Sequence, residues 1–183
     1  SSPELLRQLF YLSLKEKRNL MKQLKLLQTK ISTKSALEIQ LKLWRTTSQK
    51  IVFTNGCFDL VHLGHIDYLA KARDLGDKLI VGLNTDASVQ KVKGPSRPIK
   101  DELSRAHILA SMQFIDAVIF FDDQTPIDLI SWIKPDVLVK GGDYTIEGIV
   151  GHELVLENGG HVQTIEFVQG FSSSKLIDKI VKG

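Results

Sequence analysis

Residues 51–68 read Ile-Val-Phe-Thr-Asn-Gly-Cys-Phe-Asp-Leu-Val-His-Leu-Gly-His-Ile-Asp-Tyr. The apolar, β-branched and aromatic run from Ile51 to Thr54 is typical of a buried strand. This run ends at Asn55-Gly56, and apolar residues at helical spacing resume from Leu63. The stretch therefore predicts a strand, a glycine turn and a helix, with two histidines where the helix begins.

The predicted start of this helix has the features of a phosphate site. Gly56 and Gly64 have no Cβ, so the backbone can approach a bound group closely. The free N–H groups and the positive dipole end of a helix N-terminus favour a phosphate. His62 and His65 are three residues apart and share one face of the first turn. A zinc site is disfavoured, because no third ligand lies near these two histidines in the sequence.

The composition indicates one globular core. A chain of 183 residues with 43% hydrophobic residues can bury one good core, and two full domains are not expected. No run approaches the roughly 20 apolar residues of a membrane span, and no signal peptide is apparent, so we expect a cytoplasmic protein. Cys57 is the single cysteine and excludes an internal disulfide. No local basic group would activate it, which favours a packing role over a nucleophilic one.

The net charge of +3 is distributed unevenly along the chain. Residues 1–50 hold eleven Lys and Arg against three Asp and Glu, whereas residues 51–183 hold thirteen against eighteen. The basic character therefore belongs to the N-terminal segment. The mildly acidic remainder argues against nucleic acid as a partner.

The N-terminal segment predicts two helices. Residues 4–31 form a basic amphipathic pattern, which indicates a helix that packs on its own domain or on a second subunit; a membrane-surface or regulatory role is the alternative. A second helix is expected from Ser35 to Arg45, with Ser35 and Glu38 as a capping box and an apolar face of Leu37, Leu41 and Trp44. We divide the chain into a basic helical extension, residues 1–48, and a domain, residues 49–183.

Apolar strands alternate with helices about every 25 residues of the domain. The predicted strands are Ile51–Thr54, Lys78–Asn84, Ala117–Phe121, Val137–Val139 and Val162–Ile165. The helices that separate and follow them begin near Leu63, Asp86, Asp101, Pro126, Gly148 and Ser173. This pattern is typical of a parallel sheet covered on both faces. We therefore expect a Rossmann-like, doubly wound, five-stranded α/β fold with its site at the carboxyl ends of the strands.

Polar and glycine-rich residues follow the predicted strands. They are Asn84 and Asp86, then Lys91 and Lys93, then Gly141, Gly142 and Asp143, and finally Ser172, Ser173 and Ser174. The lysines either form a solvated helix end or neutralise a triphosphate. The serines form a plain N-cap or a phosphate cradle. The glycines make a turn or allow a nucleotide to lie against the backbone, and Arg105 makes a surface ion pair or clamps a phosphate.

The combination of strand, glycine, Phe-Asp and His-x-Gly-His resembles the signature of the nucleotidyltransferase superfamily, which includes cytidylyltransferases, adenylyltransferases and class I aminoacyl-tRNA synthetases. From about Lys50 onwards the chain is similar to the adenylyltransferase domain of heptose-phosphate enzymes, which occur as fusions with a kinase or as standalone proteins. The matching stretches are Thr54-Asn-Gly-Cys-Phe-Asp59, His62-Leu-Gly-His65, Gly82-Leu-Asn-Thr-Asp-Ala-Ser88, Lys93-Gly-Pro-Ser-Arg-Pro98 and Pro135-Asp-Val-Leu-Val-Lys-Gly-Gly-Asp-Tyr144.

This resemblance implies transfer of AMP from ATP to a heptose 1-phosphate, which makes ADP-heptose for lipopolysaccharide core. It implies His62, His65 and Lys93 as catalytic residues, Mg²⁺ bound with ATP, and a homodimer. Sugar-phosphate contacts fall to Asn84, Asp86 and Lys93. Nucleotide contacts fall to Thr54, Asn55, Gly56, Phe58, Asp59, Lys91, Arg105, Gly141, Gly142, Asp143, Ser172, Ser173 and Ser174.

Two other functions stay open on the sequence. Glycerol-3-phosphate cytidylyltransferases and FAD synthetases are similar in their histidines. The late Arg-Thr-Glu-Gly-Ile-Ser signature of the cytidylyltransferases reads here as Phe167-Val-Gln-Gly-Phe-Ser172, and the missing arginine counts against that activity. The second alternative is a non-catalytic nucleotide-binding module whose basic helices are its working surface.

Overall fold

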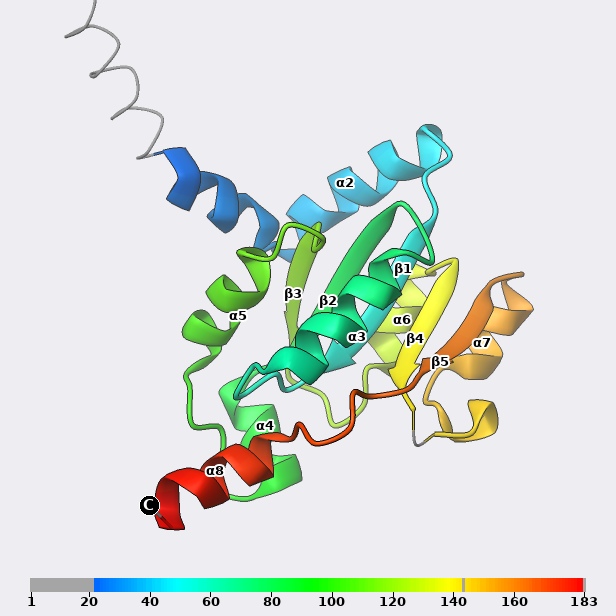
Figure 1. The fold of residues 1–183 in the computed structure, drawn as a ribbon. Coiled ribbons are helices and arrows are strands. Elements are labelled where there is room, and N and C mark those ends of the chain that lie inside the picture. Colours follow the sequence, from blue (N-terminus) through cyan, green and yellow to red (C-terminus); the bar gives the residue numbers. More distant parts are fainter. Residues whose placement is uncertain (1–21, 143, 183) are drawn as a thin grey trace, which may run out of the picture.

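Five parallel strands form the centre of the protein in a computed structural model that describes residues 22–142 and 144–182 (Figure 1). Their order across the sheet is β3-β2-β1-β4-β5, and every neighbouring pair is parallel. The strands are β1 (Ile51–Gly56), β2 (Lys78–Asn84), β3 (Ala117–Phe121), β4 (Val137–Gly141) and β5 (His161–Ile165). The predicted five-stranded Rossmann-like fold is confirmed.

The strand order reverses between β1 and β4. The chain adds β2 and β3 on one side of β1, and then crosses back to place β4 and β5 on the other side. In open parallel sheets the crevice at such a reversal, beyond the carboxyl ends of the strands, is where ligands bind. Two helices lie at this end of the sheet in Figure 1, α4 (Asp86–Lys93) and α8 (Ser173–Lys182). The fold therefore points to the same edge as the sequence motifs.

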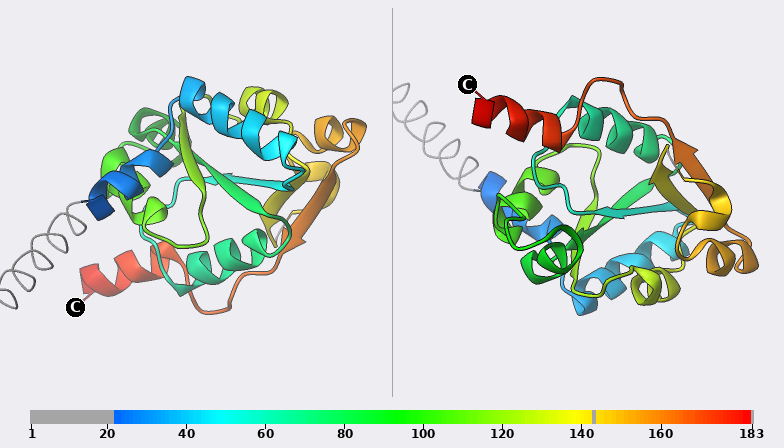
Figure 2. Two further views of the ribbon diagram at one scale, coloured as in Figure 1. Left: turned by 90° about the horizontal axis from the view of Figure 1, so that it is seen from above. Right: turned by 90° about the horizontal axis from the view of Figure 1, so that it is seen from below.

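Helices cover both faces of the sheet in three layers (Figure 2). One face packs against α3 (Leu63–Arg73) and α5 (Glu102–Ala110), and the other packs against α2 (Lys34–Thr46), α6 (Ile127–Ile133) and α7 (His152–Glu157). Successive strand residues point to opposite faces. Val52 accordingly lies in the first core and Phe53 in the second, so each strand must be apolar throughout.

The helix α2 packs in the core of the domain, whereas the sequence analysis placed it in an extension outside the domain. Leu37, Leu41 and Trp44 are buried in the same cluster as residues of the central strands. The predicted capping box is wrong: Thr33 is the N-cap, and its hydroxyl accepts a hydrogen bond from the Ala36 N–H at 3.2 Å. The packed domain therefore starts before residue 34. Residues 22–30 are helical as expected, and residues 1–21 lie outside the described part of the chain.

The segment between β4 and β5 differs from the predicted single helix. It contains a 3-10 turn, η1 (Ile146–Gly148), followed by the short α7. Gly151 lies between them with φ of 86°, a left-handed conformation that cannot continue a right-handed helix. Across residues 22–142 and 144–182 there is no helix long and apolar enough to cross a membrane.

Candidate active site

The loop between β1 and α3 brings an aromatic ring close to His65. Phe58 has φ of 45°, which is uncommon for a residue with a side chain. Its buried ring lies against Gly56, where an added Cβ would come within 3.0 Å of the ring, and 5.5 Å from the ring of His65. Gly56 therefore allows close packing of Phe58, and the Phe58 ring packs near His65.

The two histidines lie together at the start of α3. Their ring centroids are 4.0 Å apart, and the His62 backbone N–H donates to Nδ1 of His65 at 3.4 Å. This bond leaves the His65 proton on Nε2, where it can be donated to a ligand. Burial, with His62 and Lys93 nearby, lowers the pKa of His65 to about 4, and burial also lowers the pKa of His62. Both rings are therefore neutral hydrogen-bond donors at neutral pH.

A pocket of about 990 Å³ opens in front of the histidines. Its walls come from α3, the loop after α4, the end of β4, and the segment from β5 into α8. The lining residues are His62, His65, Lys93, Arg97, Gly142, Glu166, Phe167, Val168, Gln169, Gly170, Phe171, Ser172, Ser173 and Ser174. The structure thus brings together the predicted histidines, Lys93, Gly142 and the three serines.

The three serines lie at the N-terminus of α8 and face the pocket. The Ser172 hydroxyl accepts a hydrogen bond from the Lys175 N–H at 3.1 Å, so Ser172 acts as an N-cap. The Ser173 hydroxyl donates to the Leu60 carbonyl at 3.3 Å, which ties the helix to the β1–α3 loop. The remaining free N–H groups of this helix start favour an anion at the same end of the pocket.

Arg105 lies inside the protein and not in the pocket. Its fully buried guanidinium donates to the Cys57 carbonyl at 2.6 Å, to Asp86 at 2.7 Å and to the Lys100 carbonyl at 3.1 Å. It therefore joins the β1–α3 loop, the start of α4 and the loop after α4. With these bonds Arg105 and Asp86 position neighbouring segments, and the expected contacts of their side chains with phosphate and sugar have no support here.

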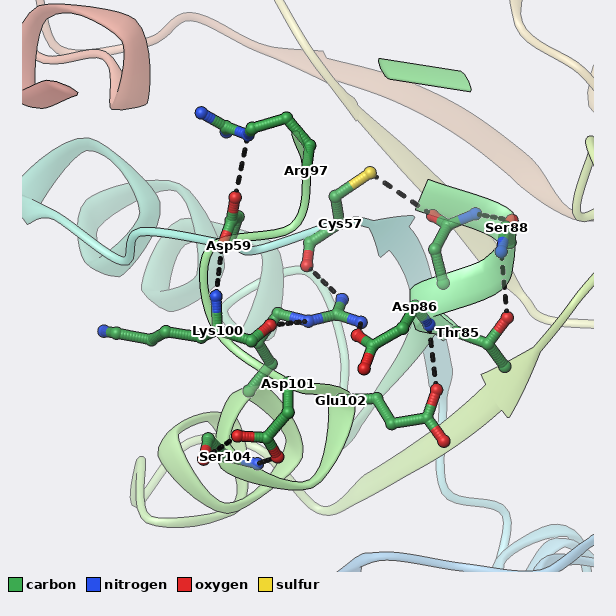
Figure 3. Close-up of polar contacts among 12 residues, drawn as sticks. Cys57, Asp59, Thr85, Asp86, Ser88, Arg97, Lys100, Asp101, Glu102 and Ser104 are labelled. Atoms are coloured by element: carbon green, nitrogen blue, oxygen red, sulfur yellow. Dashed lines mark hydrogen bonds and ion pairs between the residues drawn. The ribbon is translucent and has the colours of Figure 1, made fainter. Parts of the chain in front are cut away.

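Asp59 also has a positioning role. Its carboxylate accepts hydrogen bonds from the backbone N–H groups of Ile99, at 2.8 Å, and Lys100, at 3.0 Å. It also pairs with Arg97 at 2.9 Å (Figure 3). Asp59 is buried and does not line the pocket, so its side chain is not placed for the expected contact with nucleotide. Its bonds fix the loop that carries the pocket residue Arg97.

The two lysines of α4 separate in the structure. Lys93 lines the pocket, whereas Lys91 pairs with Asp122 at 3.5 Å on an exposed surface outside the pocket lining. Arg97 takes the second cationic place in the pocket. The sequence analysis missed Arg97, although it lies in the Gly-Pro loop that the motif match had marked.

Other predicted residues are also internal. Thr54 is fully buried, and its hydroxyl shares a 2.6 Å hydrogen bond with Tyr68. Asn84 donates to the Ser88 hydroxyl at 2.8 Å. Neither side chain lines the pocket. Asp143, a predicted nucleotide contact, lies outside the described residues.

Lys140 is a cation that the sequence analysis did not assign. It lies near the end of β4, and its ammonium donates to the Asn55 carbonyl of β1 at 3.5 Å. Burial lowers its pKa to about 8. The Asn55 side-chain oxygen beside it is buried without a hydrogen-bond partner among the described residues. A half-buried cation with a lowered pKa at the β1–β4 reversal is typical of a functional edge.

The donor set does not form a resident metal site. Within the described ranges, no group of three or more His, Cys, Asp and Glu could hold a metal ion. Glu166 is the carboxylate among the pocket-lining residues, and the same lining holds two cations, three serine hydroxyls and two imidazoles. The pocket is therefore built for an anionic ligand.

Transfer at phosphorus depends mainly on positioning and on stabilising charge. Neutral imidazole donors, two cations and a helix N-terminus around one anion pocket, at the switch point of a parallel sheet, define the nucleotidyltransferase class of enzymes. Residues 53–179 match the cytidylyltransferase-like family, and the chain belongs to this family.

Several curated relatives are bifunctional proteins HldE. That of Citrifermentans bemidjiense is 59% identical over 133 residues, which cover 73% of this chain and 27% of the relative. That of Syntrophotalea carbinolica is 51% identical over 153 residues, which cover 84% of this chain and 31% of the relative. The chain thus spans less than a third of the length of these two relatives.

One similar solved structure is the crystal structure of a lipopolysaccharide core biosynthesis protein from Thermoplasma volcanium. It is 29% identical to this chain with a TM-score of 0.53, and the match covers 66% of this chain and 97% of that one. The shared sheet and helices therefore extend over nearly the whole of that protein.

Proposed function

We propose that this chain transfers the AMP part of ATP to a heptose 1-phosphate and releases pyrophosphate. An oxygen of the sugar phosphate forms a bond to the α-phosphorus of ATP, and the bond from that phosphorus to the bridging oxygen of the β-phosphate breaks. The products are ADP-heptose and pyrophosphate. The observation that carries this proposal is the pair of neutral histidines that share one pocket with Lys93 and the serine-lined helix start.

The nucleophile needs no general base, because a sugar phosphate is already an anion near neutral pH. The residues therefore act by positioning and by binding the charge that grows on the α-phosphate oxygens. His65 donates from Nε2, since its Nδ1 already accepts the His62 N–H. His62 lies beside it in the same pocket wall and adds a second neutral donor.

The leaving pyrophosphate is bound beside the histidines, at the N-terminus of α8. The N-terminus of α8 presents Ser172 to Ser174, and Lys93 and Arg97 supply positive charge. Arg97 reaches the pocket from a loop that Asp59 holds in place. These groups bind the charge that develops on the leaving group while the bond from the α-phosphorus to the bridging oxygen breaks, which lowers the barrier rather than only tightening substrate binding.

Mg²⁺ is proposed as a partner of ATP rather than of the protein. The described residues offer no metal-binding cluster, and Glu166 alone is a carboxylate among the pocket-lining residues. A triphosphate binds Mg²⁺ through its own oxygens. When bound in this way, the ion neutralises part of the triphosphate charge.

The choice of adenine and of a heptose is supported by similarity. The motif match to heptose-phosphate adenylyltransferases covers most of the domain, and the relatives named HldE are 51–59% identical. The similar structure is that of a lipopolysaccharide core biosynthesis protein. The name of the cytidylyltransferase-like family favours CTP as the competing nucleotide, whereas Phe167 in place of an arginine argues against it.

The test is pyrophosphate release with Mg²⁺, in which ATP, GTP and CTP are each combined with α- or β-heptose 1-phosphate or glycerol 3-phosphate. We expect release from ATP with one heptose 1-phosphate anomer. Release from CTP with glycerol 3-phosphate would assign a cytidylyltransferase instead. Binding of ATP without release from any pair would assign a nucleotide-binding module.

We also propose that the protein is a cytoplasmic homodimer without a nucleic-acid partner. Exposed apolar side chains support a dimer: Ile39 and Leu43 lie one turn apart on α2, and Leu24 and Leu26 lie in the preceding helix. Light scattering coupled to size exclusion measures the mass directly. A single-chain mass across micromolar concentrations would reject the dimer.

A further inference from the structure

The ring of Phe167 lies directly on the backbone at the end of β4. A Cβ built on Gly141 would fall 1.8 Å from Cζ of Phe167 and 2.3 Å from Cε2, so no side chain fits at that position while the ring is in place. The ring of Tyr68 lies 5.6 Å from it, centroid to centroid. Tyr68 is itself held by hydrogen bonds to Thr54, at 2.6 Å, and to the Val139 carbonyl, at 3.1 Å. Phe167 is therefore supported by rigid neighbours.

Phe167 nevertheless remains open to the pocket. It lines the pocket wall, and 47% of the residue is exposed. A large aromatic ring that is supported on one side and exposed on the other offers a flat apolar surface to a ligand. The supporting contacts explain how the ring is held, but they leave its exposed side without a structural role.

The pocket has two chemically different ends. Its histidines, its two cations and the serines at the N-terminus of α8 gather the groups that bind anions. Gly142 and Phe167 lie at the end of β4 and after β5, and offer backbone and an aromatic surface instead. A nucleoside triphosphate has the same polarity, with charge at one end and a flat base at the other. A nucleotide bound with its phosphates near the histidines therefore has its base near Phe167.

We propose that Phe167 is a specificity-determining residue that stacks against the base of the nucleotide and favours a purine. This inference rests on the proposed function and identifies the residue that selects its nucleotide. A bicyclic purine covers more of a phenyl ring than a monocyclic pyrimidine does. Loss of the ring therefore weakens the binding of ATP more than the binding of CTP. Gly141 is the positioning residue, because its missing Cβ is what lets the ring occupy this place.

The experiment measures binding of Mg²⁺-ATP, Mg²⁺-CTP and inorganic tripolyphosphate by calorimetry, without acceptor. Phe167→Leu removes the ring and keeps an apolar side chain. It should weaken ATP binding by about 5- to 150-fold, the range that base–aromatic stacks give. Tripolyphosphate has no base and should bind Phe167→Leu and the wild type equally. Phe167→Tyr retains the ring and should stay within about threefold of the wild type.

Two further variants separate stacking from general damage. Gly141→Ala leaves Phe167 in the sequence but pushes its ring aside, so it should reproduce the loss of ATP affinity. Phe171 is the matched control: it is 45% exposed and lines the same pocket, but its ring lies 6.3 Å from that of His62 at the phosphate end. Phe171→Leu should therefore change ATP and CTP binding by the same factor.

The outcomes distinguish this inference from the proposed function. Unchanged ATP affinity in Phe167→Leu, or an equal loss for ATP, CTP and tripolyphosphate, would overturn the stacking role while nucleotide binding by the wild type stands. A wild type that binds tripolyphosphate but neither nucleotide would overturn the proposed function as well. A selective loss of ATP in Phe167→Leu and Gly141→Ala, with Phe171→Leu unselective, is the expected result.

Discussion

Asp59 and Arg97 form an ion pair of 2.9 Å between the β1–α3 loop and the loop after α4. The pair joins two segments that lie almost forty residues apart in the chain, and one of them leads into the helix start with both histidines. Asp59 is 2% exposed, and it also accepts hydrogen bonds from two backbone N–H groups of the second loop. The site therefore depends on a buried carboxylate that does not line the pocket.

Asp59→Asn should weaken both stability and nucleotide binding. The amide removes the charge that balances Arg97, and breaking a buried pair from one side costs about 3–5 kcal/mol. Urea denaturation measures this loss, and the KM for ATP should rise because Arg97 is released. Asp67→Asn is the matched control: its pair with Lys71 is a surface i,i+4 pair that should be worth less than about 1 kcal/mol. Equal losses for the two variants would contradict the role of Asp59.

His65→Ala should reduce kcat/KM by about 100- to 1000-fold, because one donor to the growing charge is lost. Steady-state pyrophosphate release measures the effect. His161→Ala is the control, since His161 is exposed at the start of β5 and lies outside the pocket lining. A loss below tenfold for His65→Ala would contradict the assigned role.

Lys140→Met should make the protein more stable at pH 7. The pKa of Lys140 is about 8 in the folded chain and 10.5 for an ordinary lysine, so the unfolded chain binds more protons between these values. The free energy of unfolding of the wild type therefore rises as the pH increases through this range. Met removes the buried charge, with a gain on the order of 2–3 kcal/mol at pH 7.

The measurement is urea denaturation of the wild type and Lys140→Met at pH 7 and pH 10. The difference between the two proteins should shrink at the higher pH. Lys42→Met is the control, because its side chain is 72% exposed and should change stability by less than about 0.5 kcal/mol. A difference that is the same at both pH values would show that Lys140 is not a buried titrating group.

Leu37→Ala tests whether α2 belongs to the domain. Leu37 is fully buried against the sheet, so the cavity should cost about 2–5 kcal/mol. Lys42 lies on the same helix with a side chain that is 72% exposed, so Lys42→Ala should cost less than about 1 kcal/mol. Thermal or urea unfolding measures both. Similar small losses would mean that α2 is a dispensable extension.

Much of the fold could be predicted because its signals are local. The buried strands of a parallel sheet are apolar on both faces, and β2 and β3 run over the residues expected from that pattern. The start of α3 was marked by its glycine and histidines. The expected domain boundary at residue 48 lies too late in the chain, because α2 packs in the domain core. The stripe of Leu37, Leu41 and Trp44 indicates a buried helix face, but it does not indicate which surface covers that face.

The site was predicted less completely. The histidines, Lys93, Gly142 and the serines meet in one pocket, because parallel strands end at one edge and motifs that follow them gather there. Arg105 was assigned to phosphate by residue type, and Asp59 was assigned to nucleotide by the family resemblance. Only their surroundings reveal them as buried positioning groups.

The sequence by itself determined the alternation of strands and helices, the glycine turn and the pair of histidines, since each depends on neighbours within a few residues. The tertiary structure alone decided which cations reach the pocket, which carboxylates hold loops, and that Phe167 rests on Gly141. These relationships join segments that lie far apart in the sequence, such as Gly141 and Phe167 or Asp59 and Arg97. The burial and pairing that decide them arise only when the sheet brings those segments together.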